Sequence, residues 1–103
     1  MIKVVIERLV VEGLESPYED AIANLLDVMV NAPGYISGES FCDIYKPYHY
    51  VVVANWSNEQ SWDKWFHSQE RQALLDAINP FLQYPERCSV LAGRRYHQRV
   101  EAS

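Results

Sequence analysis

The fold of this chain is decided by the stretch Pro33-Gly34-Tyr35-Ile36-Ser37-Gly38-Glu39-Ser40 and by the later run Val51-Val52-Val53-Ala54-Asn55-Trp56-Ser57. Pro33-Gly34 is a stop signal for the helical pattern before it. The residues that follow predict two strands, over 35–44 and 48–56, because β-branched and aromatic residues dominate them. Tyr45-Lys46-Pro47 lies between them as a tight connection, so this region predicts a β-hairpin.

A strand and a helix are expected before the hairpin. Residues 2–11 are rich in β-branched residues and alternate weakly, which predicts a strand buried on both faces. We expect the helix to begin at Ser16 as N-cap, with Pro17 in the first helical position and Glu19 completing a capping box. One apolar stripe at helical spacing then follows, formed by Ile22, Leu25, Leu26, Met29 and Val30.

A helical region and one strand are expected after the hairpin. Ser57 and Gln60 predict a capping box, and a second helix start is expected at Ser68, with the helix ended by Pro80. The last strand is expected over 87–93. The order β-α-β-β-α-β is that of the ferredoxin-like split βαβ arrangement, an α+β fold with helices on one face of an antiparallel sheet.

Length and charge restrict both the domain organisation and the partners. A chain of 103 residues with 49% apolar content forms a single domain, which we place at 1–95 with a C-terminal tail over 96–103. The net charge of -5 argues against a nucleic-acid partner, because phosphate binding needs clustered cations. The one basic cluster, Arg94, Arg95 and Arg99, is either a solvated tail or an arm that forms salt bridges across a subunit interface.

The N-terminal apolar run and the cysteines bear on location. Lys3, Glu7 and Arg8 interrupt the run, so no signal peptide or membrane span is expected, and we predict a cytoplasmic protein. Cys42 and Cys88 lack the spacing of metal ligands and are expected to be small buried thiols, with a disulfide between them as the alternative. No metal site is predicted.

The third strand has apolar residues on both of its faces. His49, Val51, Val53 and Asn55 alternate with Tyr50, Val52, Ala54 and Trp56. The helices can cover only one face of the sheet, and a large bare apolar sheet is rare on a monomer. We therefore expect a homodimer that packs sheet to sheet.

Three segments together resemble the antibiotic biosynthesis monooxygenase (ABM) family. They are Pro33-Gly34-Tyr35-Ile36-Ser37-Gly38-Glu39-Ser40, Val51-Val52-Val53-Ala54-Asn55-Trp56-Ser57-Asn58-Glu59-Gln60-Ser61-Trp62 and Ser68-Gln69-Glu70-Arg71-Gln72-Ala73-Leu74. The resemblance implies a dimeric α/β barrel, in agreement with the burial argument. Its motifs are specific for the fold and weak for chemistry, because most of the shared letters are turn, cap and core residues.

One branch of the family oxygenates aromatic polyketides without a cofactor. The resemblance then implies that a phenol or anthrone loses a proton and that the resulting anion reacts with dioxygen. Trp56 matches that branch's tryptophan and Trp62 falls on its helix tyrosine, whereas Val52 stands at its asparagine and Asp76 on or near its arginine.

A second branch degrades haem. Trp65 matches its tryptophan, but Glu7 stands at its asparagine and Leu75 at its iron-ligating histidine. We therefore expect neither haem nor any other cofactor.

The local candidates each have a structural alternative. Trp56, Trp62 and Trp65 are expected to be core and pocket wall at once, and Tyr35 to line the pocket or the barrel interior. Three polar residues are candidates for catalysis. Asn55 either donates a hydrogen bond to an oxyanion or satisfies the backbone at the strand end. His49 either carries a proton or lies at the rim, and His67 either carries a proton or caps the C-terminus of a helix.

Two functions stay open at this point. The first is a cofactor-free monooxygenase, or a related small enzyme, that acts on an electron-rich aromatic or quinol. The second is a non-catalytic dimeric module that binds a small apolar ligand or accompanies another enzyme. The loss of the polar groups of the oxygenase branch favours neither function.

Overall fold

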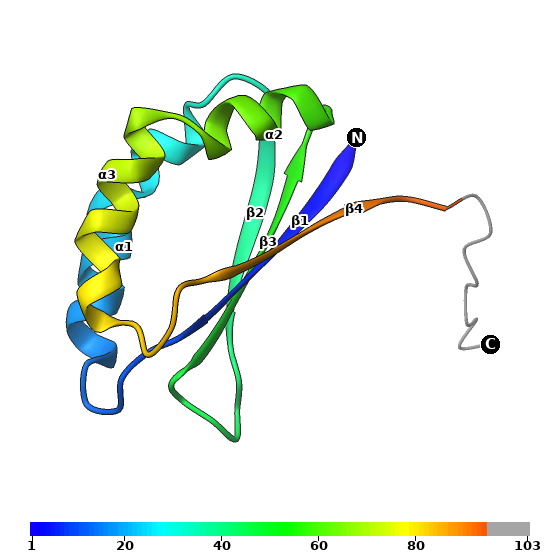
Figure 1. The fold of residues 1–103 in the computed structure, drawn as a ribbon. Helices are drawn as coiled ribbons and strands as arrows, with labels where there is room; N and C mark the ends of the chain where they lie inside the picture. The colour runs from blue at the N-terminus through cyan, green and yellow to red at the C-terminus, as the bar shows by residue number, and fades with distance from the viewer. Residues whose placement is uncertain (95–103) are drawn as a thin grey trace, which may run out of the picture.

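A computed structural model describes residues 1–94 as one antiparallel sheet with helices on one face (Figure 1). The elements are β1 (Ile2–Leu9), α1 (Glu15–Val30), β2 (Tyr35–Cys42), β3 (His49–Trp56), α2 (Glu59–Phe66), α3 (Gln69–Ile78), the short 3₁₀ helix η1 (Asn79–Phe81) and β4 (Arg87–Ala92). The strand order β2-β3-β1-β4, with every pair antiparallel, confirms the predicted ferredoxin-like fold. The proposed tail and most of the basic cluster lie outside the described residues.

Only one face of the sheet is covered within the single chain. In β1, Val4, Ile6 and Arg8 are buried toward the helices, whereas Lys3 and Glu7 are exposed on the other face. The prediction that β1 is buried on both faces is therefore wrong for the single chain. The buried Arg8 explains the weak alternation, because it places a charged residue on the inner face.

Two of the three predicted helix starts are wrong in detail. Helix α1 begins at Glu15 with Leu14 as N-cap and no side-chain cap, and Pro17 falls in the third position. Proline is tolerated there because the first turn has no intrahelical acceptor for its backbone nitrogen. Helix α2 is capped by Asn58 rather than Ser57, since Asn58 Oδ1 accepts the Ser61 backbone N–H at 2.8 Å.

The second helix start after the hairpin is confirmed. Ser68 is the N-cap of α3, and its Oγ accepts the Arg71 backbone N–H at 3.1 Å. The chain thus breaks between α2 and α3, and this break places Trp62 and Trp65 over one end of the sheet and Leu74 over the other.

Gly34 fixes the entry into the hairpin. Its φ is +89°, and its carbonyl accepts the Ser57 backbone N–H at 2.8 Å, which ties the start of β2 to the end of β3. A Cβ at this position would lie 2.3 Å from Cβ and Oγ of Ser61. Gly34 is therefore required both by its backbone conformation and by the close approach of α2.

We expect Gly34→Ala to destabilise the protein more than Gly13→Ala. Gly13 has a similar φ of +93°, but no atom lies within 4 Å of a Cβ there. The left-handed conformation costs roughly 1–2 kcal/mol in both variants, and only Gly34→Ala adds the clash with Ser61. Urea unfolding of both variants measures the difference, and equal losses would contradict the close approach of α2.

Candidate functional site

Four of the predicted site residues form one aromatic cluster at the end of the sheet. Trp56 lies at its centre, with ring-centroid distances of 5.5 Å to Tyr35, 5.6 Å to Trp62 and 6.3 Å to Trp65. Trp56 has no exposed surface, and no acceptor among the described residues pairs with its Nε1. Burial of this depth makes Trp56 a core residue in the single chain, and burial raises the pKa of the neighbouring Tyr35.

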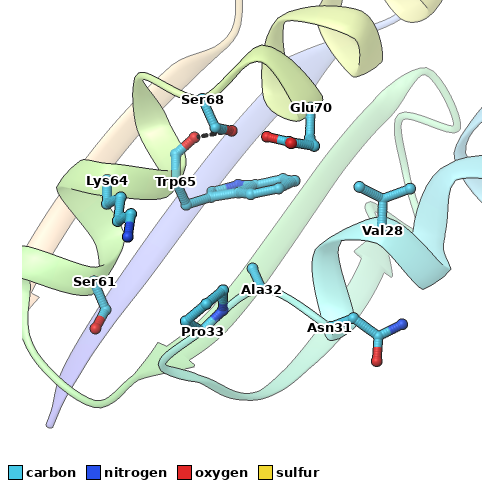
Figure 2. Close-up of a pocket in the computed structure, with 9 residues that line it drawn as sticks. All are labelled: Val28, Asn31, Ala32, Pro33, Ser61, Lys64, Trp65, Ser68 and Glu70. Carbon is cyan, nitrogen blue, oxygen red and sulfur yellow. Dashed lines mark hydrogen bonds between the residues drawn. The ribbon is translucent and has the colours of Figure 1, made fainter.

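Trp65 alone of the three tryptophans borders an open hollow. Figure 2 shows its ring between Val28 of α1 and Ala32, just after that helix, on one side and Ser68 and Glu70 on the other. The hollow has a volume of about 300 Å³, and Asn31, Pro33, Ser61 and Lys64 complete its lining. Its rim is mostly polar, and Trp65 itself is only 7% exposed. This hollow therefore offers a ligand the edge of one aromatic ring and one exposed lysine.

A larger and more apolar cleft opens between α1 and the β2–β3 edge of the sheet. We call it the α1 cleft. Its volume is about 380 Å³, and its lining is formed by Tyr18, Glu19, Ile22, Ala23, Leu26, Ser40, Phe41, Cys42, Tyr50, Val51 and Val52. A volume of this size lies at the small end of the range for ligand sites.

An inner chamber of about 30 Å³ lies between the helices and the sheet and shares four lining residues with the α1 cleft. The shared residues are Ile22, Leu26, Ser40 and Val52. Ile6, Met29, Leu74 and Arg8 complete its lining. The chamber is large enough for one small polar group, and Arg8 is the one charged residue in its lining.

Arg8 belongs to a buried ion network that spans β1, α3 and the approach to β4. Its Nε donates to Glu86 Oε2 at 2.8 Å, and Arg71 Nη2 donates to the other oxygen of the same carboxylate. All three side chains are at most 8% exposed. Arg8 Nη1 also donates to the Tyr18 hydroxyl at 3.2 Å. We call Arg8, Glu86 and Arg71 the arginine–glutamate network.

The outer side of this network is formed by aromatic rings and a thiol. The Arg71 guanidinium lies 4.4 Å from the centre of the Phe66 ring and 6.0 Å from that of Trp62. The Cys88 thiol lies 3.7 Å from both Arg71 Nη2 and Glu86 Oε1. Burial lowers the pKa of Arg71 from its ordinary value, but a guanidinium stays protonated at any physiological pH.

The mouth of the α1 cleft carries a phenol paired with a carboxylate. The Tyr50 hydroxyl donates to Glu19 Oε2 at 2.5 Å. Burial first, and then the hydrogen bond to Glu19, raise the pKa of Tyr50, so this phenol stays protonated. Burial likewise raises the pKa of the nearby Cys42 thiol. The exposed Glu19 is then the only carboxylate in the cleft lining, and it is the group there that can accept a proton.

The three polar residues expected to carry catalysis lie away from the α1 cleft. Asn55 lies on the helix-free face of the sheet, where its Nδ2 donates to Ser37 Oγ at 2.9 Å. His67 is the C-cap of α2 and lies 3.0 Å from the Asp63 carbonyl through its Nδ1. His49 also faces away from the helices, between Glu7 and Asp43. The structure therefore brings the four aromatic candidates together and leaves the three polar ones apart.

His49 is held by carboxylates on both ring nitrogens. Its Nδ1 lies 3.2 Å from Asp43 Oδ2 and its Nε2 lies 3.1 Å from Glu7 Oε2. Only the protonated ring can donate from both nitrogens, and the hydrogen bonds to Asp43 and Glu7 raise the pKa of His49. The pKa of Asp43 is lowered by the Tyr45 backbone N–H and by His49.

We expect His49→Gln to lose stability mainly at low pH. Because the folded-state pKa of His49 is raised, its contribution is complete below the ordinary value of about 6.5 and disappears as the pH rises through the folded-state value. Unfolding free energies of wild type and variant should therefore differ most near about pH 5.5 and converge at alkaline pH. His67→Gln serves as the control at an exposed histidine. A difference in unfolding free energy between wild type and His49→Gln that grows with pH would contradict a protonated His49 between Glu7 and Asp43.

The side chains that could ligate a metal or haem are scattered over the described residues. Within residues 1–94, no group of three His, Cys, Asp or Glu side chains is placed to hold a metal ion. Leu75 packs against the core around Val10 and Ile78, and Glu7 contacts His49 on the opposite face. Cys42 and Cys88 are free thiols, but Cys42 is exposed, so the prediction that both are buried is wrong for Cys42. No helix of this region has the length and apolarity to cross a membrane. The cytoplasmic location stays a prediction.

Sequence patterns did not find the arginine–glutamate network or the tyrosine that joins it. Arg8, Tyr18, Arg71 and Glu86 were absent from the predicted site. One signal was available for Arg8, since it occupies an inward position of β1 according to the alternation of Val4 and Ile6. An arginine at such a position requires a buried partner.

Comparisons with known proteins agree with this fold. A model of the antibiotic biosynthesis monooxygenase family matches residues 1–77. No curated protein matches the chain. Many solved structures match the fold of the chain.

Three of these structures illustrate the similarity. SnoaB from Streptomyces nogalater, a cofactor-independent oxygenase, is 15% identical with a TM-score of 0.78, over 92% of this chain and 95% of its own. A conserved protein from Methanosarcina mazei Go1 is 15% identical with a TM-score of 0.82, over 90% and 92%. Rv0793 from Mycobacterium tuberculosis is 15% identical with a TM-score of 0.79, over 99% and 98%. Identities this low establish the fold only.

Proposed function

We propose that this chain is a monooxygenase-type enzyme that oxidises a small electron-rich aromatic without a cofactor. The proposal starts from its family, because the chain belongs to the antibiotic biosynthesis monooxygenase family. The observation that carries this proposal is the α1 cleft, an apolar space that shares lining residues with a chamber whose lining includes the buried Arg8. A site of this kind combines a mostly apolar lining with a fixed positive charge, and the charge stabilises an aromatic anion.

The reaction requires one base, one stabilised anion and dioxygen. In an anthrone, the methylene carbon between the two aromatic rings gives a proton to Glu19. The negative charge passes through the rings to the ketone oxygen, where Arg8 stabilises it. The carbanion transfers one electron to dioxygen, and the resulting radical and superoxide combine as a peroxide anion, which takes the proton back from Glu19 and becomes a hydroperoxide. Loss of water, which takes the second C–H proton, leaves a ketone, so that R₂CH₂ and O₂ give R₂C=O and H₂O.

This assignment departs from the expected catalytic residues. Asn55 and His49 face the helix-free side of the sheet and His67 caps α2, so none of them reaches the α1 cleft. Trp62 lies beside Arg71 of the network, and Trp56, Trp65 and Tyr35 pack with Trp62 in the core.

A second function is favoured by one observation. The only carboxylate in the cleft lining, Glu19, is exposed and already accepts a hydrogen bond from Tyr50. Weak general-base capacity fits a module that binds a small apolar ligand without converting it. Oxygen consumption separates the two functions.

The experiment measures oxygen uptake with anthrones and hydroquinones. Ile22→Phe narrows the α1 cleft, and Val28→Phe narrows the hollow beside Trp65 from the same helix. We expect Ile22→Phe to lower uptake at least about tenfold, since a blocked site loses substrate positioning, and Val28→Phe to leave it unchanged. No uptake by the wild type on any substrate, with ligand binding retained, would favour the binding module. If only Val28→Phe lowered oxygen uptake, the substrate site would be the hollow beside Trp65 instead of the α1 cleft.

The helix-free face of the sheet supports the dimer part of the proposal. It carries Val5 and Val53, with Leu91 about half exposed at 47%. We propose that a second copy covers this face, as the two-faced pattern of β3 suggests. Light scattering at micromolar concentration should give the mass of a dimer, and a stable monomer would contradict the packing.

A further inference from the structure

Four residues beside the α1 cleft tie helix α1 to the two central strands of the sheet. Tyr18 and Glu19 are consecutive residues of α1, and Arg8 of β1 pairs directly with Tyr50 of β3 in the sheet register. Arg8 Nη1 donates to the Tyr18 hydroxyl at 3.2 Å, and the Tyr50 hydroxyl donates to Glu19 Oε2 at 2.5 Å. Each central strand therefore contributes one side-chain hydrogen bond to α1.

The two tyrosine rings join these hydrogen bonds into one cluster. The ring centroids of Tyr18 and Tyr50 lie 4.7 Å apart, and the two residues are only 3% and 9% exposed. Both residues also line the α1 cleft. Rings packed this closely have little freedom to turn, so each hydroxyl restricts the place of its partner group.

The Glu19 carboxylate needs such a restriction if it is to act as a base. Glu19 is exposed, and an exposed glutamate side chain turns freely in water unless a partner holds it. Within residues 1–94, the Tyr50 hydroxyl is the one side-chain donor that bonds to this carboxylate. Burial and then this hydrogen bond raise the pKa of Tyr50, so the phenol keeps its proton and remains a donor.

We propose that Tyr50 and Tyr18 are positioning residues of this site. Tyr50 holds the Glu19 carboxylate at the mouth of the α1 cleft, Tyr18 holds the Arg8 guanidinium, and the packed rings fix the spacing between these two charged groups. The inference rests on the proposed reaction, in which Glu19 takes a proton from the substrate and later returns it to the peroxide anion. A carboxylate held in one place serves both proton transfers.

Tyr50→Phe separates positioning from packing. The substitution keeps the ring that lines the α1 cleft and removes only the hydroxyl that holds Glu19. We expect kcat for oxygen uptake with an anthrone to fall about 3- to 10-fold, the effect of one hydrogen bond, and KM to stay within about twofold. Tyr18→Phe should give the same pattern through Arg8. Tyr84→Phe is the matched control, because Tyr84 is 61% exposed and lies outside the cleft lining.

A measurement without turnover observes the hydrogen bond between Tyr50 and Glu19 directly. In protein with ¹³C-labelled tyrosine rings, the Tyr50 hydroxyl proton should resonate downfield and exchange slowly with water, as expected for a buried phenol bonded to a carboxylate. We expect Glu19→Gln to move this signal upfield and to speed up its exchange, because the acceptor loses its charge. Glu12→Gln, at an exposed carboxylate of a loop, should leave the signal unchanged.

The kinetic and spectroscopic results decide the inference separately from the reaction. Wild-type kcat in Tyr50→Phe or in Tyr18→Phe, or a change confined to KM, would overturn the role of that tyrosine. A Tyr50 hydroxyl signal that is missing in the wild type, or unchanged in Glu19→Gln, would overturn the hold on the carboxylate. A signal that depends on Glu19 without any oxygen uptake by the wild type would remove the reaction and keep that hold.

Discussion

Glu86→Gln is expected to lower the free energy of unfolding by about 3–5 kcal/mol, one of the two largest effects in this protein. The substitution keeps the size of the side chain and removes the only negative charge between Arg8 and Arg71. Two guanidinium groups would then lie buried and facing each other without a counterion. Guanidinium chloride is unsuitable as denaturant because it screens charge, so urea unfolding followed by far-UV circular dichroism is the measurement.

A matched control and a triple variant test the physical reason. Glu12→Gln removes a carboxylate from an exposed loop and should change stability by less than about 0.5 kcal/mol. The triple variant Arg8→Met, Arg71→Met and Glu86→Leu should recover most of the loss, since apolar residues of similar volume carry no desolvation penalty. A Glu86→Gln protein as stable as Glu12→Gln would show that the network is not buried as described.

Trp56→Ala is expected to cost about 3–5 kcal/mol, the typical loss for a large aromatic deleted from a core. Trp56 is fully buried at the centre of the aromatic cluster, where Tyr35, Trp62 and Trp65 contact it and cannot all move into the space. Far-UV circular dichroism again follows unfolding, because tryptophan fluorescence would change with the substitution itself.

Trp56→Phe separates ring packing from hydrogen bonding. No acceptor among the described residues pairs with the indole Nε1, so Trp56→Phe loses volume but no hydrogen bond, and we expect less than half of the loss seen in Trp56→Ala. Tyr45→Ala, at a position 86% exposed, should have little effect. A loss in Trp56→Phe equal to that in Trp56→Ala would indicate an unseen partner for the indole nitrogen.

The fold was predictable because its signals are local. The Ser68 cap, the break between α2 and α3 and the hairpin depend on residues a few positions apart, and the structure confirms them. The start of α1 was misplaced because Ser16 and Glu19 have capping-box spacing, whereas the chain turns earlier, at Gly13, whose backbone N–H is bound by Glu15. Local spacing alone could not distinguish these two starts.

The candidate site was only partly predictable because its polar residues meet across the chain. Arg8 and Glu86 are 78 positions apart, and Arg71 joins them from a third element. No spacing rule relates such residues. The aromatic cluster was easier to find, since Trp62 and Trp65 share a helix face, but its role as packed core around Trp56 depends on how α2 lies on the sheet.

Methyl NMR tests the central claim, that the α1 cleft holds an aromatic substrate, most directly. Labelled methyl groups of Ile22, Leu26 and Val52 report on the cleft, and those of Val5 and Val53 report on the helix-free face. On addition of an anthrone under anaerobic conditions, we predict chemical-shift changes concentrated at Ile22, Leu26 and Val52. Changes confined to Val5 and Val53, with the cleft methyls unmoved, would contradict the claim.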